Sequence, residues 1–172
     1  IPEMLKTAKD MGITTLTDTD NYGLSLTLGG GGVKLLEMMS VYGTIASGGV
    51  RFDPNPILEV TDASGNILED RHEASGRRAL TEEVAYLLTS ILSDNNARAP
   101  AFGTNSQLVI PKHIVAAKTG TSDDKRDNWA FGYTPEYVVG VWVGNNDNSP
   151  MDPRLTSGIT GATPIWHDIM VN

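Results

Sequence analysis

Three β-rich segments follow one another closely in the second half of the chain, and they limit its fold more than any other feature does. They cover residues 114–121, 127–133 and 137–143, with a Thr-Pro-Glu turn between the last two. Apolar side chains alternate along the second and third segments, as they do in strands. Connections this short join neighbouring antiparallel strands, because parallel strands need a crossover of a dozen or more residues. The sequence therefore predicts an antiparallel three-stranded meander.

Four helices are expected around this meander. Residues 2–10 form a short one that ends at Gly12, and a second follows the glycine run at residues 29–32 and ends near residues 48 and 49. Thr81 is expected to cap a third helix. Apolar residues at helical spacing predict which sides of the second and third helices are buried: Leu35, Met38, Val41, Tyr42 and Ile45 in the second, and Val84, Leu87, Leu88 and Ile91 in the third.

The last helix is expected over about residues 163–171, with Pro164 at its first position. Its predicted apolar side consists of Ile165, Trp166 and Ile169. Residues 50–54 and 57–61 resemble short strands, and a hairpin turn at residues 63–66 leads into Ile67 and Leu68. Residues 95–111 are expected to be a loop. The predicted fold class is mixed α/β, with an antiparallel sheet and helices.

Composition excludes several classes of function. A net charge of −8 without clustered lysine and arginine argues against a nucleic-acid partner. The chain has no cysteine, and His72, His113 and His167 lack the spacing of metal ligands, so no metal site is expected. No cofactor motif is present, since the lysine after the glycine run is followed by leucine instead of the serine or threonine of a phosphate loop. At 172 residues the chain corresponds to one domain or a large part of one.

The first strand of the meander ends in four residues that offer a cation, hydroxyls and an open backbone: Lys118, Thr119, Gly120 and Thr121. Alternation places Lys118 and Gly120 on one face and the two threonines on the other. The lysine can attract a carboxylate, and the glycine lets another group approach the backbone. The lysine and glycine on one face and the threonines on the other can contact the same ligand only if this strand is a twisted edge strand. By itself K-T-G also fits a plain strand end beside a turn, so its neighbours must decide.

The neighbouring sequence resembles bifunctional, class A penicillin-binding proteins. Residues 116–122, 127–135 and 141–145 match the third-motif region of that family in order and spacing, and the resemblance extends upstream and downstream to residues 26–30, 42–49 and 157–162. Residues 97–103 look most like the subgroup called penicillin-binding protein 1C. The resemblance covers nearly the whole chain and implies that residues 1–172 are the C-terminal part of a transpeptidase domain with the fold shared by β-lactamases.

The family relationship implies serine acyl transfer that cross-links peptidoglycan stem peptides and is blocked by β-lactams. It implies that Lys118 and Thr121 are catalytic and that Thr119, Gly120 and Thr121 bind substrate, with the Thr121 N–H as one of two oxyanion-hole donors. The expected partners are stem peptides, β-lactams and the upstream part of the same protein. The expected location is outside the cytoplasmic membrane, in a membrane-anchored parent protein.

Two segments match the sequence patterns of the family's other two motifs, but they lie at the wrong places in the chain. Ser122 to Lys125 fit S-x-x-K, and Ser93 to Asn95 fit S-D-N, but Ser122 follows the K-T-G-T segment in a charged loop and Ser93 ends a predicted helix. The true S-x-x-K and S-x-N motifs are therefore expected before Ile1, and this chain alone should be inactive. The alternative is a non-catalytic wall-binding or interaction module that retains the K-T-G-T cleft.

Overall fold

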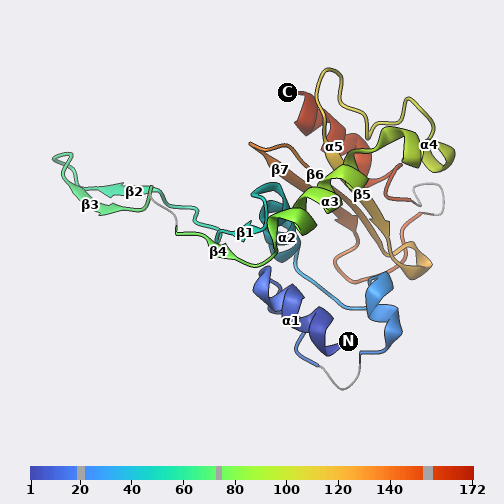
Figure 1. The fold of residues 1–172 in the computed structure, drawn as a ribbon, viewed down its shortest axis with the longest axis horizontal. Coiled ribbons are helices and arrows are strands. Elements are labelled where there is room, and N and C mark those ends of the chain that lie inside the picture. Colours follow the sequence, from blue (N-terminus) through green and yellow to red (C-terminus); the bar gives the residue numbers. More distant parts are fainter. Residues whose placement is uncertain (19–21, 73–74, 153–156) are drawn as a thin grey trace.

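A computed structural model describes residues 1–18, 22–72, 75–152 and 157–172, which form helices on both faces of an antiparallel sheet and an arm that extends from them (Figure 1). The helices are α1 (Pro2–Asp10), the 3-10 helix η1 (Leu24–Leu28), α2 (Leu35–Ala46), α3 (Glu82–Ser93), α4 (Asn95–Phe102), the 3-10 turn η2 (Asp123–Lys125) and α5 (Ala162–Val171). The strands are β1 (Val50–Arg51), β2 (Glu59–Thr61), β3 (Ile67–Asp70), β4 (Arg77–Arg78), β5 (Ala116–Thr121), β6 (Asp127–Tyr133) and β7 (Val138–Gly144). The predicted mixed α/β class is confirmed.

The meander predicted from the sequence is present as the sheet β5-β6-β7, with β5 at one edge. The β5–β6 ladder is continuous from Ala116 opposite Tyr133 to Thr121 opposite Asn128. The turn between β6 and β7 uses Thr134, whose hydroxyl accepts the backbone N–H groups of Glu136 and Tyr137. The turn residues and the alternation of apolar side chains thus favour the same strand pairing that the structure shows, which explains why the prediction succeeded.

Helix α5 covers one face of the sheet. Trp166 is fully buried and packs with Ala117, Ala130 and Val141, which belong to three successive strands. A Cβ atom at Gly132 would lie 2.2 Å from Cζ2 of Trp166, so a glycine is required where the indole meets the sheet.

Helices α2 and α3 cover the opposite face. Tyr42 of α2 stacks on Phe131 with ring centroids 4.8 Å apart, and it also contacts Tyr133. Burial, followed by the neighbouring Tyr133, raises the pKa of Tyr42 to about 12. Tyr133 in turn shares a 2.8 Å hydrogen bond with Thr89 of α3. The predicted apolar side of α2 is confirmed, because all five predicted residues pack in the hydrophobic cluster between α2, α3 and the sheet: Leu35, Met38, Val41, Tyr42 and Ile45.

The predicted apolar sides of α3 and α5 are partly wrong. In α3 the inward side is Ala85, Leu88 and Leu92, whereas Val84, Leu87 and Ile91 are exposed. In α5 Trp166 is buried as expected, but Ile165 and Ile169 are about half exposed, and the helix begins at Ala162, so that Pro164 is its third residue. Each helix carries apolar residues on more than one side, and the covering element chooses among them.

Residues 95–111 are not a loop throughout, because α4 occupies Asn95–Phe102. The Asp94 side chain caps this helix by accepting the N–H groups of Asn96 and Ala97, both at 2.9 Å. Pro100 lies inside the helix. The helix is short enough that the N–H missing at proline leaves only one carbonyl without its helical partner.

An arm extends from the body between α2 and α3 (Figure 1). Its base is the β1–β4 pair, and its end is the antiparallel β2–β3 hairpin. The Asp62 carboxylate closes the hairpin turn by accepting the N–H groups of Ser64 and Asn66. The predicted hairpin is confirmed, although the two predicted strands are shorter than expected and β4 was not predicted.

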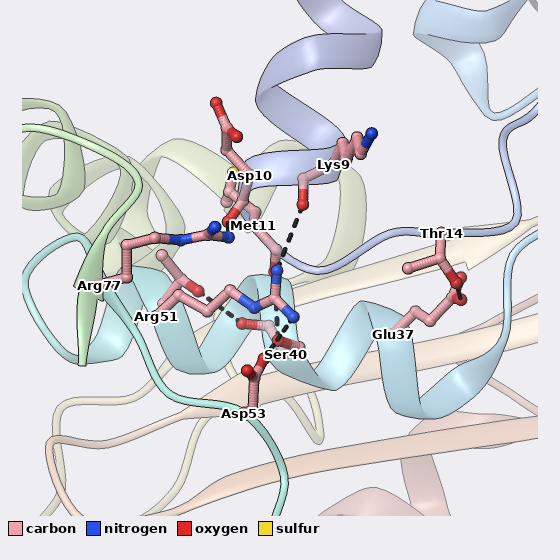
Figure 2. Close-up of polar contacts among 10 residues, drawn as sticks. Lys9, Asp10, Met11, Thr14, Glu37, Ser40, Arg51, Asp53 and Arg77 are labelled. Atoms are coloured by element: carbon pink, nitrogen blue, oxygen red, sulfur yellow. Dashed lines mark hydrogen bonds and ion pairs between the residues drawn. The ribbon is translucent and has the colours of Figure 1, made fainter. Parts of the chain in front are cut away.

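The N-terminal helix is attached to α2 and to the base of the arm by polar contacts (Figure 2). Arg51 and Arg77 donate to the carbonyls of Lys9 and Asp10 at the C-terminus of α1, where cations are favourable, and Ser40 donates to Met11. Gly12 follows with a φ of 113°, which confirms the predicted glycine stop. No helix within the described part of the chain is long and apolar enough to span a membrane.

Candidate active site

The K-T-G-T segment forms the last four of the six residues of β5, at the free edge of the sheet. Lys118 and Gly120 lie on the same face as Ala116, which packs toward α2 and α3, and Lys118 is exposed there. Gly120 is opposite Trp129, whose Cβ would be 3.3 Å from a Cβ at this glycine. Thr119 and Thr121 alternate toward the side of α5. For one ligand to contact residues on both faces of this strand, the strand must lie at an edge of the sheet, and β5 does.

Main-chain groups of alternate β5 residues point away from β6. Arg98 of α4 donates to the carbonyl of Ala117 at 3.3 Å, and the Lys118 ammonium donates to the carbonyl of Thr119, so both carbonyls face the free edge. Ser122 N–H, in contrast, points inward and donates to Asp127. Because neighbouring residues of a strand point their N–H groups in opposite directions, the N–H of Thr121 faces the free edge.

The Thr121 hydroxyl contacts the segment that precedes α5. It accepts the N–H of Gly158 at 2.9 Å, a contact between residues 37 positions apart. A hydroxyl has two lone pairs and one hydrogen, so this bond leaves the hydrogen of Thr121 free to be donated. The free edge of β5 thus combines an ammonium group, a hydroxyl that can donate and an outward N–H, a set suited to an anionic, carbonyl-containing ligand.

Arg98 joins this edge to the helices beside it. Its guanidinium donates to Leu92 at the end of α3 as well as to Ala117. Burial lowers the pKa of Arg98, while Asp94 opposes the shift. Sequence reasoning assigned no role to Arg98 or to the contact with Gly158, because both depend on residues distant in the chain.

Ser122 lies next to these residues but is held in a closed loop. Its hydroxyl accepts the N–H of Asp127 and donates to the carboxylate of that residue, both at 2.8 Å. The same carboxylate accepts Nε1–H of Trp142. Lys125, the lysine of the apparent S-x-x-K, belongs to a 3-10 turn and has a φ of 57°. The segment therefore has neither the helix nor the serine–lysine pairing that activates a serine nucleophile.

Ser93 lies at the junction of two helices. Its hydroxyl donates to the carbonyl of Ser90 within α3, and the next residue, Asp94, caps α4. The turn chemistry expected for this segment is confirmed. The aromatic residues of the sheet are part of the fold as well, because Phe131 is buried and Trp129 stacks on it.

Metal ligands are not assembled in the described ranges, which contain no group of three or more His, Asp and Glu residues able to hold a metal ion. The three histidines lie on separate elements. His72 pairs with Asp70 on the arm, and His167 contacts the carbonyl of Gln107.

Comparison with known proteins identifies the relatives of this chain. Residues 7–171 match the family model described as the penicillin-binding protein transpeptidase domain. The chain is 31% identical to penicillin-binding protein 2D of Bacillus subtilis over 98% of its own length and 24% of that protein, and 33% identical to penicillin-binding protein 1A of Aquifex aeolicus over 85% of its length and 19% of that protein. It thus spans about a quarter or less of these relatives, and its placement in subgroup 1C stays a prediction.

Solved structures show the same fold. PonA1 from Mycobacterium tuberculosis superposes with a TM-score of 0.81 and 24% identity, covering 99% of this chain and 49% of that one. The same protein in complex with penicillin V gives a TM-score of 0.82. Penicillin-binding protein 1A from Haemophilus influenzae gives 0.75 over 95% of this chain and 29% of that one. From the family match over residues 7–171 and these relatives, the chain belongs to the penicillin-binding protein transpeptidase family.

Proposed function

We propose that this chain is the C-terminal part of a D,D-transpeptidase domain, which cross-links peptidoglycan stem peptides by serine acyl transfer and is acylated by β-lactams. The observation that carries the proposal is the free edge of β5, where the Lys118 ammonium, the Thr121 hydroxyl and the outward Thr121 N–H lie along one strand. Family membership gives the reaction class, and this edge provides the groups that such a reaction needs.

Each group has a role in the proposed mechanism. Lys118 supplies positive charge beside the serine that relays protons, and the hydroxyls of Thr119 and Thr121 bind the terminal carboxylate of the substrate or of a β-lactam. Gly120 lets the substrate approach the backbone of β5. The N–H of Thr121 donates to the oxyanion of the tetrahedral intermediate, and loss of one such donor typically costs about 10²–10³ in rate.

The nucleophile in this proposal belongs to a part of the protein upstream of residue 1. Neither serine has the helix and the paired lysine of an S-x-x-K motif: the Ser93 hydroxyl donates to a main-chain carbonyl within α3, and the Ser122 hydroxyl is held by Asp127 in a closed loop. The 172-residue chain alone is therefore inactive. The complete protein is membrane-anchored and acts outside the cytoplasmic membrane, where its stem-peptide substrates lie.

The absence of a nucleophile from this chain can be tested by mass spectrometry. The isolated chain, incubated with a labelled penicillin, should give no covalent adduct by intact-mass analysis, whereas the complete protein should give one adduct per molecule. A stoichiometric adduct on Ser122 or Ser93 of the isolated chain would show that the nucleophile has been placed wrongly. A complete protein that forms no adduct at all would favour a non-catalytic module.

The roles of the β5 residues can be tested in the complete protein. Lys118→Ala and Thr121→Val should each lower the acylation rate by about 10- to 100-fold, the effect of losing an interaction with a charged group, while the N–H of Thr121 is retained. Lys125→Ala is the matched control, because Lys125 lies in the η2 turn, seven residues beyond Lys118, and should have little effect. Acylation rates of the three variants, each checked for an unchanged melting temperature, decide the assignment. Equal effects of all three would reject it.

The upstream part of the domain, in this proposal, packs on the exposed side of α3. Val84, Leu87 and Ile91 repeat at helical spacing, and their exposed fractions rise from 42% to 68%. An exposed apolar stripe of this kind on a helix normally packs against another structural element. The chain also covers only 49% of the PonA1 chain on which it superposes, which leaves room for a covering segment.

The covering segment can be detected by association. The isolated chain should form larger species as its concentration rises in light scattering, and Leu87→Lys with Ile91→Lys should suppress this. Leu68→Lys on the arm is the control, since Leu68 is equally exposed but lies outside the proposed interface. A monomer at every concentration that does not bind the separately produced upstream part would refute this packing.

A further inference from the structure

Thr163 is a fully buried polar residue at the start of α5 to which neither the K-T-G-T segment nor the proposed roles give a function. Its hydroxyl donates to the carbonyl oxygen of Gly158 at 2.7 Å, and its own N–H donates to the same oxygen at 2.8 Å. Two donors from one residue therefore hold one peptide group. The first turn of α5 in this way fixes the position of the segment that precedes it.

Gly158 lies directly on the strands of the candidate active site. A Cβ atom at this position would be 2.8 Å from the carbonyl oxygens of Gly120 and Trp129 and 3.0 Å from Cβ of Thr119. Distances this short to backbone atoms exclude any side chain. The glycine thus lets the main chain approach β5 closely enough for the N–H of Gly158, in the peptide group before the one that Thr163 holds, to reach the hydroxyl of Thr121 at 2.9 Å.

These contacts form a continuous path from α5 to the active site. Thr163 holds the carbonyl of Gly158, and the N–H of Gly158 occupies one lone pair of the Thr121 hydroxyl. Since that hydroxyl cannot donate its hydrogen to an N–H group, the hydrogen turns toward another acceptor. At the free edge of β5 the acceptor would be the carboxylate of a bound ligand. A strong hydrogen bond to a carboxylate depends on this orientation.

We propose that Thr163 is a positioning residue for carboxylate recognition: through Gly158 it orients the Thr121 hydroxyl so that the hydroxyl donates to the ligand carboxylate. This rests on the proposed function, because it takes Thr121 as a substrate-binding residue. Thr163 touches neither substrate nor nucleophile. Its effect should therefore fall on the recognition of the carboxylate and leave the chemistry at the carbonyl unchanged.

The test compares two ligands in the complete protein: a penicillin with its free carboxylate and the methyl ester of the same penicillin. Thr163→Val keeps the shape of the side chain and removes the hydroxyl. It should lower the acylation rate with the free acid by about 3- to 10-fold, the usual effect of one hydrogen bond, and change the rate with the ester little. Thr163→Ser retains a hydroxyl and should restore the ratio of the two rates.

A matched control comes from a second buried threonine. The hydroxyl of Thr44 donates to the carbonyl of Ser40 at 2.8 Å, and Thr44 is 1% exposed, but this bond lies within α2 and does not involve the segment around Gly158. Thr44→Val should leave the ratio of acid to ester unchanged. An equal change of that ratio in Thr44→Val, or a fall of both ligand rates together in Thr163→Val, would mean that general loosening of the fold is responsible, and would overturn the inference.

Hydrogen exchange tests the structural link without relying on acylation. The amide of Gly158 should exchange faster in Thr163→Val than in the unsubstituted protein, and at the original rate in Thr163→Ser and Thr44→Val. Unchanged exchange in Thr163→Val refutes the link. If the unsubstituted protein does not acylate at all, the proposed function fails; if it acylates and Thr163→Val keeps the original ratio, only the positioning role of Thr163 fails.

Discussion

The sheet β5-β6-β7 and the arm that ends in β2 and β3 are both antiparallel, yet different interactions hold them. Both faces of the sheet are covered by helices, and Trp166 beneath it is 0% exposed. On the arm every residue of β3 is exposed, including Leu68 at 66%. The arm keeps its shape through a closed turn at Asp62, the ion pair Arg71–Glu69 and the hydrogen bond between His72 and Asp70.

The difference teaches that the sheet depends on contacts between residues far apart in the chain, whereas the arm depends on contacts between near neighbours. Burial of apolar surface contributes most to stability, and exposed ion pairs contribute little. Changes in the sheet should therefore affect the whole molecule, and changes on the arm should remain local. The candidate active site lies on the edge of the sheet, where long-range contacts hold its geometry.

The largest effect is expected from Trp166→Ala. Removal of this buried indole leaves a cavity between α5 and the sheet, which should lower the free energy of unfolding by about 3–5 kcal/mol. Denaturant unfolding of the 172-residue chain measures it. Leu68→Ala on the arm is the comparison and should change stability by about 0.5 kcal/mol or less, because its side chain is already exposed. Similar losses in both variants would remove the distinction between the two regions.

Two glycines with positive φ provide a second comparison, at the base and at the tip of the arm. A Cβ at Gly49, φ 92°, would lie 2.4 Å from the carbonyl oxygen of Leu80, whereas a Cβ at Gly65, φ 83°, meets nothing within 4 Å. Gly49→Ala should cost about 2 kcal/mol or more, since strain and a backbone clash add. Gly65→Ala carries only the strain, about 1–2 kcal/mol at most.

Thermal unfolding of the two glycine variants, with hydrogen exchange over the arm, separates these effects. Gly49→Ala should lower the melting temperature of the whole chain, and Gly65→Ala should mainly speed exchange between residues 59 and 70. Equal melting temperatures for the two variants would mean that the base of the arm is as independent of the body as its tip.

Glu37 should make the attachment of the N-terminal segment to α2 sensitive to pH. Burial alone would raise the pKa of Glu37, but hydrogen bonds from Thr14 and Thr15 overcome it and lower the pKa from 4.5 to about 2 (Figure 2). A lowered pKa in the folded state stabilises the protein above the unfolded pKa, and this stability is lost as the pH falls toward 2. The carboxylate is partly exposed, so solvent screens the interaction and the contribution should be about 1 kcal/mol or less.

Unfolding of the unsubstituted chain and of Glu37→Gln over a pH series measures this contribution. The difference in unfolding free energy should be constant above about pH 5 and should decrease between pH 4.5 and 2. Glu3→Gln serves as a control on α1. A difference that does not depend on pH would show that the two threonines do not hold the ionised form.

The smallest effect is expected from Asp62→Ala at the tip of the arm. Hydrogen bonds from Asn66 and Ser64 lower the pKa of Asp62, so the turn is held by the ionised carboxylate. The substitution should open the hairpin, seen as faster amide exchange of Ser64 and Asn66, and leave the global unfolding transition unchanged. A clear shift of that transition would contradict the independence of the arm.

The sequence predicted well wherever a feature depends on neighbouring residues. Alternation along β6 and β7, the Thr134 turn, the Thr81 cap and the glycine stop at Gly12 were all found as expected. The K-T-G-T strand was also recognisable, because its four residues are contiguous. The helix α4 was missed because residues 93–95 were interpreted as the turn chemistry that ends α3, whereas Asp94 also caps a second helix.

The sequence by itself determined the family, the antiparallel meander and the strand that carries Lys118 and Thr121, since each is written in a short run of residues. Only the tertiary structure decided which sides of α3 and α5 are buried, that β5 is an edge strand, and that Gly158 donates to Thr121. The physical reason is that burial and hydrogen bonding across 37 positions depend on how elements pack. Local periodicity specifies an element, but the surface that covers it selects the face that becomes the core.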